Sequence, residues 1–209
     1  MSFKRLTCLG FFFILVIQVL MIASIYRLTR DIHGRLDTIE EVFGAANRIR
    51  SYIETKKKSI KDSVLDSSYF TLFVSNLFKI DHRLLVAQME VESDFRINAT
   101  GRLGELGLLQ IRPETFKEYG WGSLDDWQDL FLVSVKHLSR IAALTGGDLE
   151  WMLSAYNAGH NLKREESIRR ANKYFKKVMR AKDEFERWDR FGSHGIDTGR
   201  RSGGCDTCL

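Results

Sequence analysis

The chain has 209 residues, 44% of them hydrophobic, which suits one ordinary domain with additional segments and excludes a disordered chain. Its net charge of +5 comes from scattered basic residues, so composition does not favour nucleic acid as a partner. Three cysteines, Cys8 near the N-terminus and Cys205 and Cys208 near the C-terminus, exclude a disulfide scaffold. Helical apolar spacing recurs almost everywhere after residue 25 and strand-like alternation is missing, so we predict an all-α fold.

The first segment, residues 1–26, is predicted to be a transmembrane anchor. Residues 7–26 read TCLGFFFILVIQVLMIASIY and carry no charge. About 20 such residues are what a helix needs to cross a hydrocarbon core of ~30 Å. A cleaved signal peptide is the alternative, but the apolar run is long for one and residues 23–25 are a poor cleavage site. Basic residues flank both ends, so charge does not set the orientation.

The second segment, residues 27–66, is predicted to be a helical stalk. Apolar residues follow the alternating spacing of three and four residues that is typical of a coiled coil, broken by Arg35. These residues are Ile25, Leu28, Ile32, Ile39, Val42, Ala46, Ile49 and Ile53. The spacing indicates a homo-oligomer through residues 25–53. A single amphipathic helix lying on a membrane, or on the domain that follows, is the alternative.

Residues 67–188 are predicted to form the globular domain. Asp81 is a suitable N-cap for a helix that ends near Glu92. A glycine-rich loop or small hairpin over residues 97–107 leads to helices over 113–119, 126–144, 148–158 and 164–187. Residues 189–209 offer little to bury, so we expect a disordered tail.

Three short segments of this domain carry the chemistry. They are MEVESDF at residues 89–95, GELGLLQIRPET at 104–115 and SAYNAG at 154–159. Their order and spacing resemble the soluble lytic transglycosylase (SLT) domain family, which is related to goose-type lysozyme, over roughly residues 70 to 180. Tyr174 in a late helix fits the same resemblance. Leu109 replaces the usual Met. In the helix at 130–138, Ser134 and His137 stand where the family tends toward Gly and Tyr, and these departures concern the sugar subsites rather than the reaction.

The reaction explains why a glutamate is needed. Breaking a glycosidic bond requires a proton on the leaving oxygen, and a carboxylic acid in apolar surroundings can supply it near neutral pH. Glu92 is the candidate catalytic residue, although a lone glutamate near a helix end is usually a solvated charge. The resemblance implies that the C6 hydroxyl of muramic acid attacks, leaving a 1,6-anhydro end. If one of Asp94, Glu105, Glu114 or Asp125 faced Glu92, a lysozyme-like hydrolase would be indicated instead.

The same resemblance implies the substrate-binding residues Ser93, Leu109, Gln110, Tyr156 and Asn157. Ser93 would orient Glu92 or bind an N-acetyl group, and Gln110 would bind sugar near the cut. For each the structural alternative remains open: a surface amide for Gln110, a core residue for Tyr156 and a C-terminal cap for Asn157. The histidines lack metal-ligand spacing, so we predict no metal site, and no cofactor is implied.

Peptidoglycan, the predicted substrate, lies outside the inner membrane. We therefore expect a single-pass inner-membrane protein with a periplasmic catalytic domain, or a virion-associated protein if the source is viral. Partners in secretion, conjugation or virus entry, or a role in wall remodelling, fit equally well. A catalytically inactive glycan-binding or coiled-coil assembly component is the alternative from another class.

Overall fold

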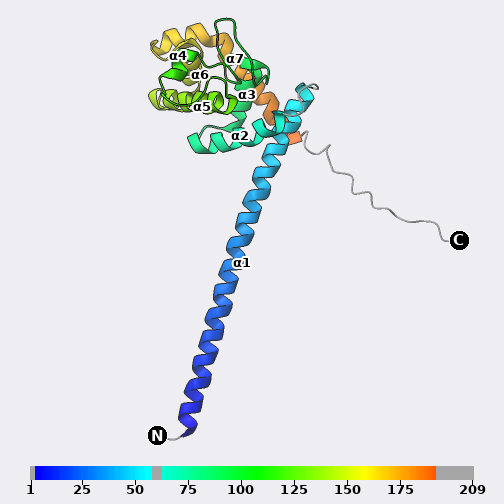
Figure 1. Ribbon diagram of the computed structural model, residues 1–209, viewed down its shortest axis with the longest axis vertical. Coiled ribbons are helices and arrows are strands. Elements are labelled where there is room, and N and C mark those ends of the chain that lie inside the picture. The colour runs from blue at the N-terminus through cyan, green and yellow to red at the C-terminus, as the bar shows by residue number, and fades with distance from the viewer. Residues whose placement is uncertain (1–2, 58–62, 192–209) are drawn as a thin grey trace, which may run out of the picture. The chain divides into compact units, whose positions relative to one another are not determined.

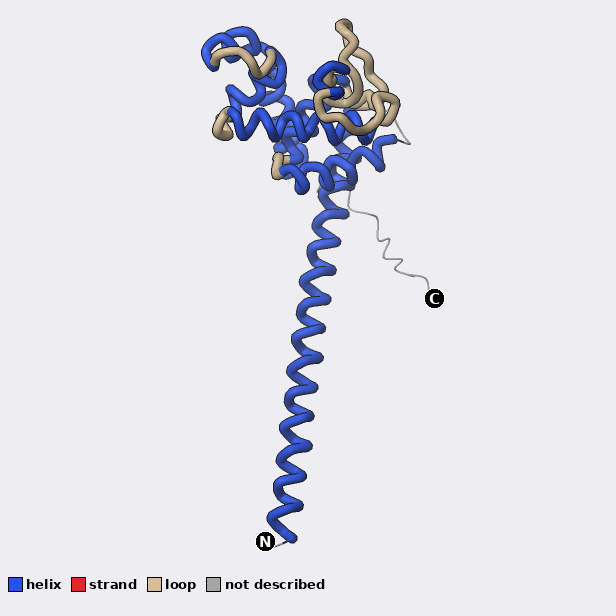
Figure 2. Tube along the Cα trace, turned by 60° about the vertical axis from the view of Figure 1, so that its left-hand side comes forward, coloured by secondary structure: helices blue, strands red, loops and turns tan. Residues whose placement is uncertain are grey.

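The computed structural model describes residues 3–57 and 63–191, with side chains at 18, 20–57 and 66–191. Two compact units, Met1–Ala45 and Ala46–Leu209, are distinguished by their internal contacts. Residues 192–209, the larger part of the predicted disordered tail with Cys205 and Cys208, lie outside the described residues. The described ranges contain helices and only isolated β-bridges (Figure 1; Figure 2), so the predicted all-α fold is confirmed there. The helices are α1 (Phe3–Lys56), α2 (Ser63–Phe78), α3 (His82–Ser93), α4 (Pro113–Lys117), α5 (Trp127–Leu144), α6 (Leu149–Ala158) and α7 (Arg164–Phe191).

The first unit consists of helix α1 up to Ala45. The structure here does not support the predicted transmembrane anchor. No helix in residues 3–57 and 63–191 has both the length and the apolar character needed to cross a bilayer. A span needs about 20 consecutive apolar residues. The continuously described side chains of α1 begin at residue 20, and their apolar run ends at Tyr26, before Arg27, Arg30 and Asp31. The side chains at 7–17 lie outside the described residues. This finding overturns the predicted location, a single-pass inner-membrane protein with a periplasmic catalytic domain.

The second unit is organised around helix α3. Six consecutive residues of this helix are buried, and the helix packs against both α2 and α7. Helix α7 is amphipathic: its buried residues recur every three or four positions, which places them on one face. Helix α6 packs between α5 and α7, and α4 packs on α5. These six residues are Leu84, Leu85, Val86, Ala87, Gln88 and Met89, and Ser93 in the last turn is buried as well.

The C-terminal turns of α1 belong to this second unit. Ala46, Ile49, Tyr52 and Ile53 are buried. The Tyr52 ring lies 4.9 Å from that of Phe185 on α7, measured between centroids. The compact unit therefore begins at residue 46, whereas the sequence placed the start of the domain near residue 67. The reason is that the same apolar spacing serves a coiled coil and a helix that packs on a domain.

Three aspartates fix the starts of the helices around the core. Asp81 accepts a hydrogen bond from the backbone N–H of Arg83 at 3.0 Å, as its predicted N-cap role requires. Asp126 accepts from two backbone N–H groups at the start of α5, and Asp148 accepts from that of Trp151 in α6 at 2.9 Å. These caps set where α3, α5 and α6 begin and hence which residues reach their C-terminal ends.

Candidate active site

Glu92 lies in the last turn of α3. The helix ends at Asp94, which adopts a left-handed conformation (φ 55°) and donates its backbone N–H to the Glu90 carbonyl at 3.1 Å. Phe95 also has a positive φ, 60°, and its side chain is buried. The chain therefore turns sharply after Glu92 and leaves its carboxyl group at the edge of a pocket.

The surroundings of Glu92 change its acidity. The pKa of the carboxyl group is raised from 4.5 to about 7, chiefly by burial and to a smaller extent by the negative charge of Glu105. A hydrogen bond from the Tyr174 hydroxyl acts in the opposite direction and lowers the pKa. The carboxyl group thus carries its proton up to near-neutral pH, which a general acid requires.

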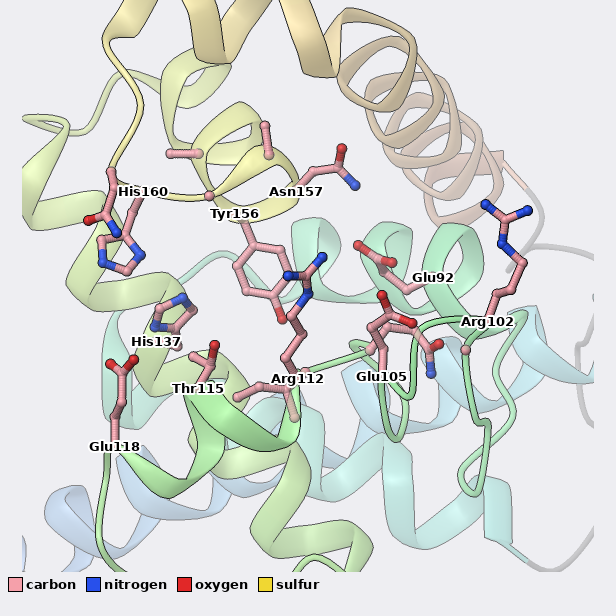
Figure 3. Close-up of a pocket in the computed structure, with 17 residues that line it drawn as sticks. Glu92, Arg102, Glu105, Arg112, Thr115, Glu118, His137, Tyr156, Asn157 and His160 are labelled. Carbon is pink, nitrogen blue, oxygen red and sulfur yellow. The ribbon is translucent and has the colours of Figure 1, made fainter.

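The pocket beside Glu92 has a volume of about 460 Å³. It is lined by the end of α3, the loop between α3 and α4, helix α4, one residue of α5 and the C-terminal end of α6 with the residues that follow it. Figure 3 shows the carboxyl groups of Glu92 and Glu105 pointing toward the same part of the pocket. The ring of Tyr156 lies beside this part of the pocket, and His137 and His160 lie farther away (Figure 3).

The loop between α3 and α4 is held by Gln110. This residue has a positive φ of 51°, and its Nε2 donates to the carbonyls of Gly107 at 2.8 Å and Ala99 at 3.2 Å. Gly107 also has a positive φ, 76°, and a Cβ there would lie 3.3 Å from Leu130 on α5. The close approach that Gly107 permits is therefore to α5, not to the pocket, whereas Gln110 does line the pocket.

Tyr156 joins the end of α6 to the same loop. Its hydroxyl donates to the Leu109 carbonyl at 2.9 Å. Burial raises the pKa of this hydroxyl, and the negative charge of Glu92 raises it further, so Tyr156 stays protonated and can donate. Asn157 lines the pocket next to Tyr156 and is exposed.

Two of the predicted substrate-binding residues are not on the pocket surface. Ser93 is 1% exposed and its Oγ donates to the Met89 carbonyl at 3.0 Å. Leu109 is also 1% exposed, and its carbonyl accepts from the hydroxyl of a pocket residue, Tyr156. The structure brings the other predicted residues, Glu92, Gln110, Tyr156 and Asn157, together around one pocket.

Sequence reasoning did not single out the arginines of the pocket, Arg102 and Arg112, or the pairing of Tyr119 with His137. The Tyr119 hydroxyl lies 3.0 Å from His137 Nδ1, and burial lowers the pKa of His137 to about 4, with a smaller contribution from His160. The imidazole is therefore neutral at pH 7. The position of His137 on the buried face of α5 was the one signal of this pairing in the sequence. Its partner Tyr119 comes from the turn after α4, which the sequence does not place beside α5.

With this geometry in place, comparison with known proteins decides the family. The family model described as the transglycosylase SLT domain matches residues 73–179, about half of the chain. The chain belongs to this family. Membership confirms the predicted enzyme class, a peptidoglycan lytic transglycosylase, and agrees with the range over which the sequence resembles SLT domains.

A solved structure similar to this SLT domain is an inactive mutant of the lytic transglycosylase Slt from Pseudomonas aeruginosa. The two chains are 19% identical, with a TM-score of 0.47. The match covers 56% of this chain and 23% of the Slt chain, so the present chain spans about a quarter of that protein's length.

Proposed function

We propose that this chain cleaves the β-1,4 bond between N-acetylmuramic acid and N-acetylglucosamine in peptidoglycan and leaves a 1,6-anhydro end. The observation that carries the proposal is the position of Glu92: a carboxyl group with a pKa near 7, in the wall of a pocket large enough for sugar. A group with this pKa is available in both protonation states near neutral pH.

In the proposed mechanism Glu92 acts twice. The protonated carboxyl first gives its proton to the glycosidic oxygen, the bond from that oxygen to C1 breaks, and positive charge develops on the muramic acid ring. The C6 hydroxyl of the same sugar then attacks C1, and the Glu92 carboxylate takes the hydroxyl proton. The enzyme ends in its starting protonation state, so no water and no second acid enters the balance.

The substrate-binding residues fall into two groups in this proposal. Gln110, Tyr156 and Asn157 contact the sugars directly, because they line the pocket on the sides next to Glu92. Ser93 and Leu109 act indirectly: Ser93 holds the last turn of α3 through the Met89 carbonyl, and the Leu109 carbonyl fixes the Tyr156 hydroxyl.

The test is to digest purified peptidoglycan with the full chain and identify the released ends by mass spectrometry. We expect 1,6-anhydro ends from the wild type and no release by Glu92→Gln, with circular dichroism showing that the variant folds. Intact glycan after incubation with the wild type would contradict an enzymatic function and favour the alternative, a glycan-binding module. Full turnover by Glu92→Gln would remove Glu92 from the mechanism.

A second candidate, a lysozyme-like hydrolase of the same bond, is favoured by one observation. Glu105 lines the same pocket and its charge raises the pKa of Glu92, so a second carboxylate faces the first. In a hydrolase such a carboxylate would activate water or form a covalent intermediate. Reducing ends, together with loss of activity in Glu105→Gln, would establish this candidate. Anhydro ends with activity retained in Glu105→Gln would exclude it.

We also propose that α1 pairs with a second copy of the chain. Ile25, Leu28, Ile32, Ile39 and Val42 are exposed along α1 at coiled-coil spacing. These five residues form the contact seam of the proposed coiled coil. The seam ends at Val42, because the next predicted positions, from residue 46 onward, are buried in the second unit.

Sedimentation of the full chain tests this pairing. Lysine at both Ile32 and Ile39 should yield monomers, because two charges would be buried in the seam. Thr38→Lys is the control off the seam and should leave the mass unchanged. A wild-type chain that sediments as a monomer would contradict the pairing.

A further inference from the structure

Gln88 is a buried polar residue whose position suggests a role in the active site. It precedes Glu92 by one turn of α3, so the two side chains lie on the same face of the helix. Its side chain is 0% exposed, and its Nε2 donates to the Tyr174 hydroxyl at 3.1 Å. Its Oε1 has no hydrogen-bond partner within the described ranges. Burying a polar atom without a partner costs free energy, so an apolar residue would suit the packing better.

Tyr174 links Gln88 to the catalytic carboxyl group. It extends from α7 and is buried, its hydroxyl accepts from Gln88 Nε2 at 3.1 Å, and the same hydroxyl is close enough to the Glu92 carboxyl group to act as a hydrogen-bond donor that lowers its pKa. A tyrosine hydroxyl has a single proton. Because the amide nitrogen of Gln88 can only donate, the tyrosine oxygen accepts there, and its proton is directed to Glu92.

The direction of this proton depends on which end of the amide meets Tyr174. If Gln88 presented Oε1 to the hydroxyl, the tyrosine proton would go to Gln88 and Glu92 would lose its donor. With Nε2 facing the hydroxyl, the donor remains on Glu92, where it favours the ionised carboxylate. The carboxylate is the form that must accept a proton in the second half of the proposed reaction.

We propose that Gln88 is a positioning residue that acts through Tyr174, directing the tyrosine proton onto Glu92. Its importance for turnover rests on the proposed function, whereas its effect on the Glu92 carboxyl group does not. The other ionisable groups that line the pocket are Tyr156 from α6, His137 from α5, Glu118 after α4, His160 after α6, and Glu105, Arg102 and Arg112 from the loop between α3 and α4. None of these is altered by a substitution at Gln88.

The experiment measures the titration midpoint of the Glu92 carboxyl group by carbon-13 NMR of the full chain, assigned by its absence in Glu92→Gln. Tyr174→Phe should raise the midpoint by roughly one pH unit, because it removes the donor to the carboxylate, and Gln88→Met should raise it by a smaller amount, because the hydroxyl keeps its proton but loses the amide that directs it to Glu92. The double variant should titrate like Tyr174→Phe alone. Gln88→Leu repeats the test with a side chain of different shape.

The controls separate positioning from packing. Met89→Leu, a buried neighbour on α3, should leave the midpoint unchanged. Gln88→Met should unfold at the same denaturant concentration as the wild type or a higher one, since an unpartnered buried oxygen is removed. An unchanged midpoint in Gln88→Met, or additive shifts in the double variant, would overturn the proposal.

Measuring turnover of the same variants tests the role of Gln88 independently of the NMR titration. Gln88→Met should lower kcat with little change in KM, and activity should persist to higher pH than in the wild type. If the wild type released no glycan ends, the proposed function would fail while the NMR titration would still test Gln88. If turnover were normal and the midpoint did not move, only the role of Gln88 would fail.

Discussion

Replacing Glu92 by glutamine is expected to stabilise the protein at high pH while removing activity. The pKa of Glu92 is about 7 in the folded chain against 4.5 ordinarily, a difference of 7 − 4.5, or about 2.5 units. At about 1.36 kcal/mol per unit this corresponds to roughly 3 kcal/mol. Solvent at the open side of the pocket screens part of it, so we expect about 2 kcal/mol.

The direction of this pH dependence of the unfolding free energy follows from whether the folded or the unfolded chain holds the Glu92 proton. Between pH 4.5 and about 7 the folded chain keeps a proton on Glu92 that the unfolded chain has lost. Wild-type stability therefore falls as pH rises through this window and levels off above it. Glutamine does not ionise, so the advantage of Glu92→Gln over the wild type should be about 2 kcal/mol larger at pH 8 than at pH 4.

The assay is urea unfolding of both full chains, followed by circular dichroism at pH 4 and pH 8. Ser154→Ala is the control, because it changes a buried residue of α6 that has no charge in either state. Its effect on the free energy of unfolding should be equal at the two pH values. An advantage of Glu92→Gln that is the same at pH 4 and pH 8, or larger at pH 4, would refute the buried-acid reasoning.

Three further outcomes follow from the geometry of the pocket. Release of glycan ends by the wild type should decline as pH rises through about 7, because Glu92 loses the proton it must donate, and a rate that keeps rising to pH 9 would contradict this. In Gly101→Ala the new Cβ would lie 2.4 Å from Glu105 Oε2 and 2.5 Å from Gln110 Oε1, so the sugar-contacting amide of Gln110 should be displaced and activity should drop several-fold, while urea unfolding changes by less than about 1 kcal/mol. Tyr156→Phe loses the 2.9 Å bond to the Leu109 carbonyl and should cost about 1 kcal/mol in urea unfolding.

Local sequence signals predicted the helices and the position of Glu92 well. The Asp81 cap fixed the start of α3, and the turn at Asp94 fixed its end, so a glutamate in the last turn could be placed without tertiary information. The segment holding Gln110 and that holding Tyr156 are short motifs in fixed order, and the fold brings both to the pocket.

What the sequence did not predict depends on contacts between distant segments. Ser93 and Leu109 belong to the same motifs as pocket residues, yet they face the interior, since neighbouring positions in a motif point to different sides. Gln88 and Tyr174 are separated by 86 residues, and only the packing of α7 on α3 joins them. The burial of residues 46–53 was missed because apolar spacing does not identify the surface against which a helix packs.

A single carboxyl group can serve both halves of the proposed reaction only if its proton affinity changes during the reaction. Before the bond breaks, burial and the charge of Glu105 favour the protonated acid. Once positive charge develops on the sugar beside it, that charge and the hydrogen bond from Tyr174 both favour the carboxylate. Glu105 and Tyr174 therefore act on opposite steps, and removing them should move the Glu92 midpoint in opposite directions: down in Glu105→Gln and up in Tyr174→Phe. Shifts of the same sign would show that the two groups do not divide the reaction in this way.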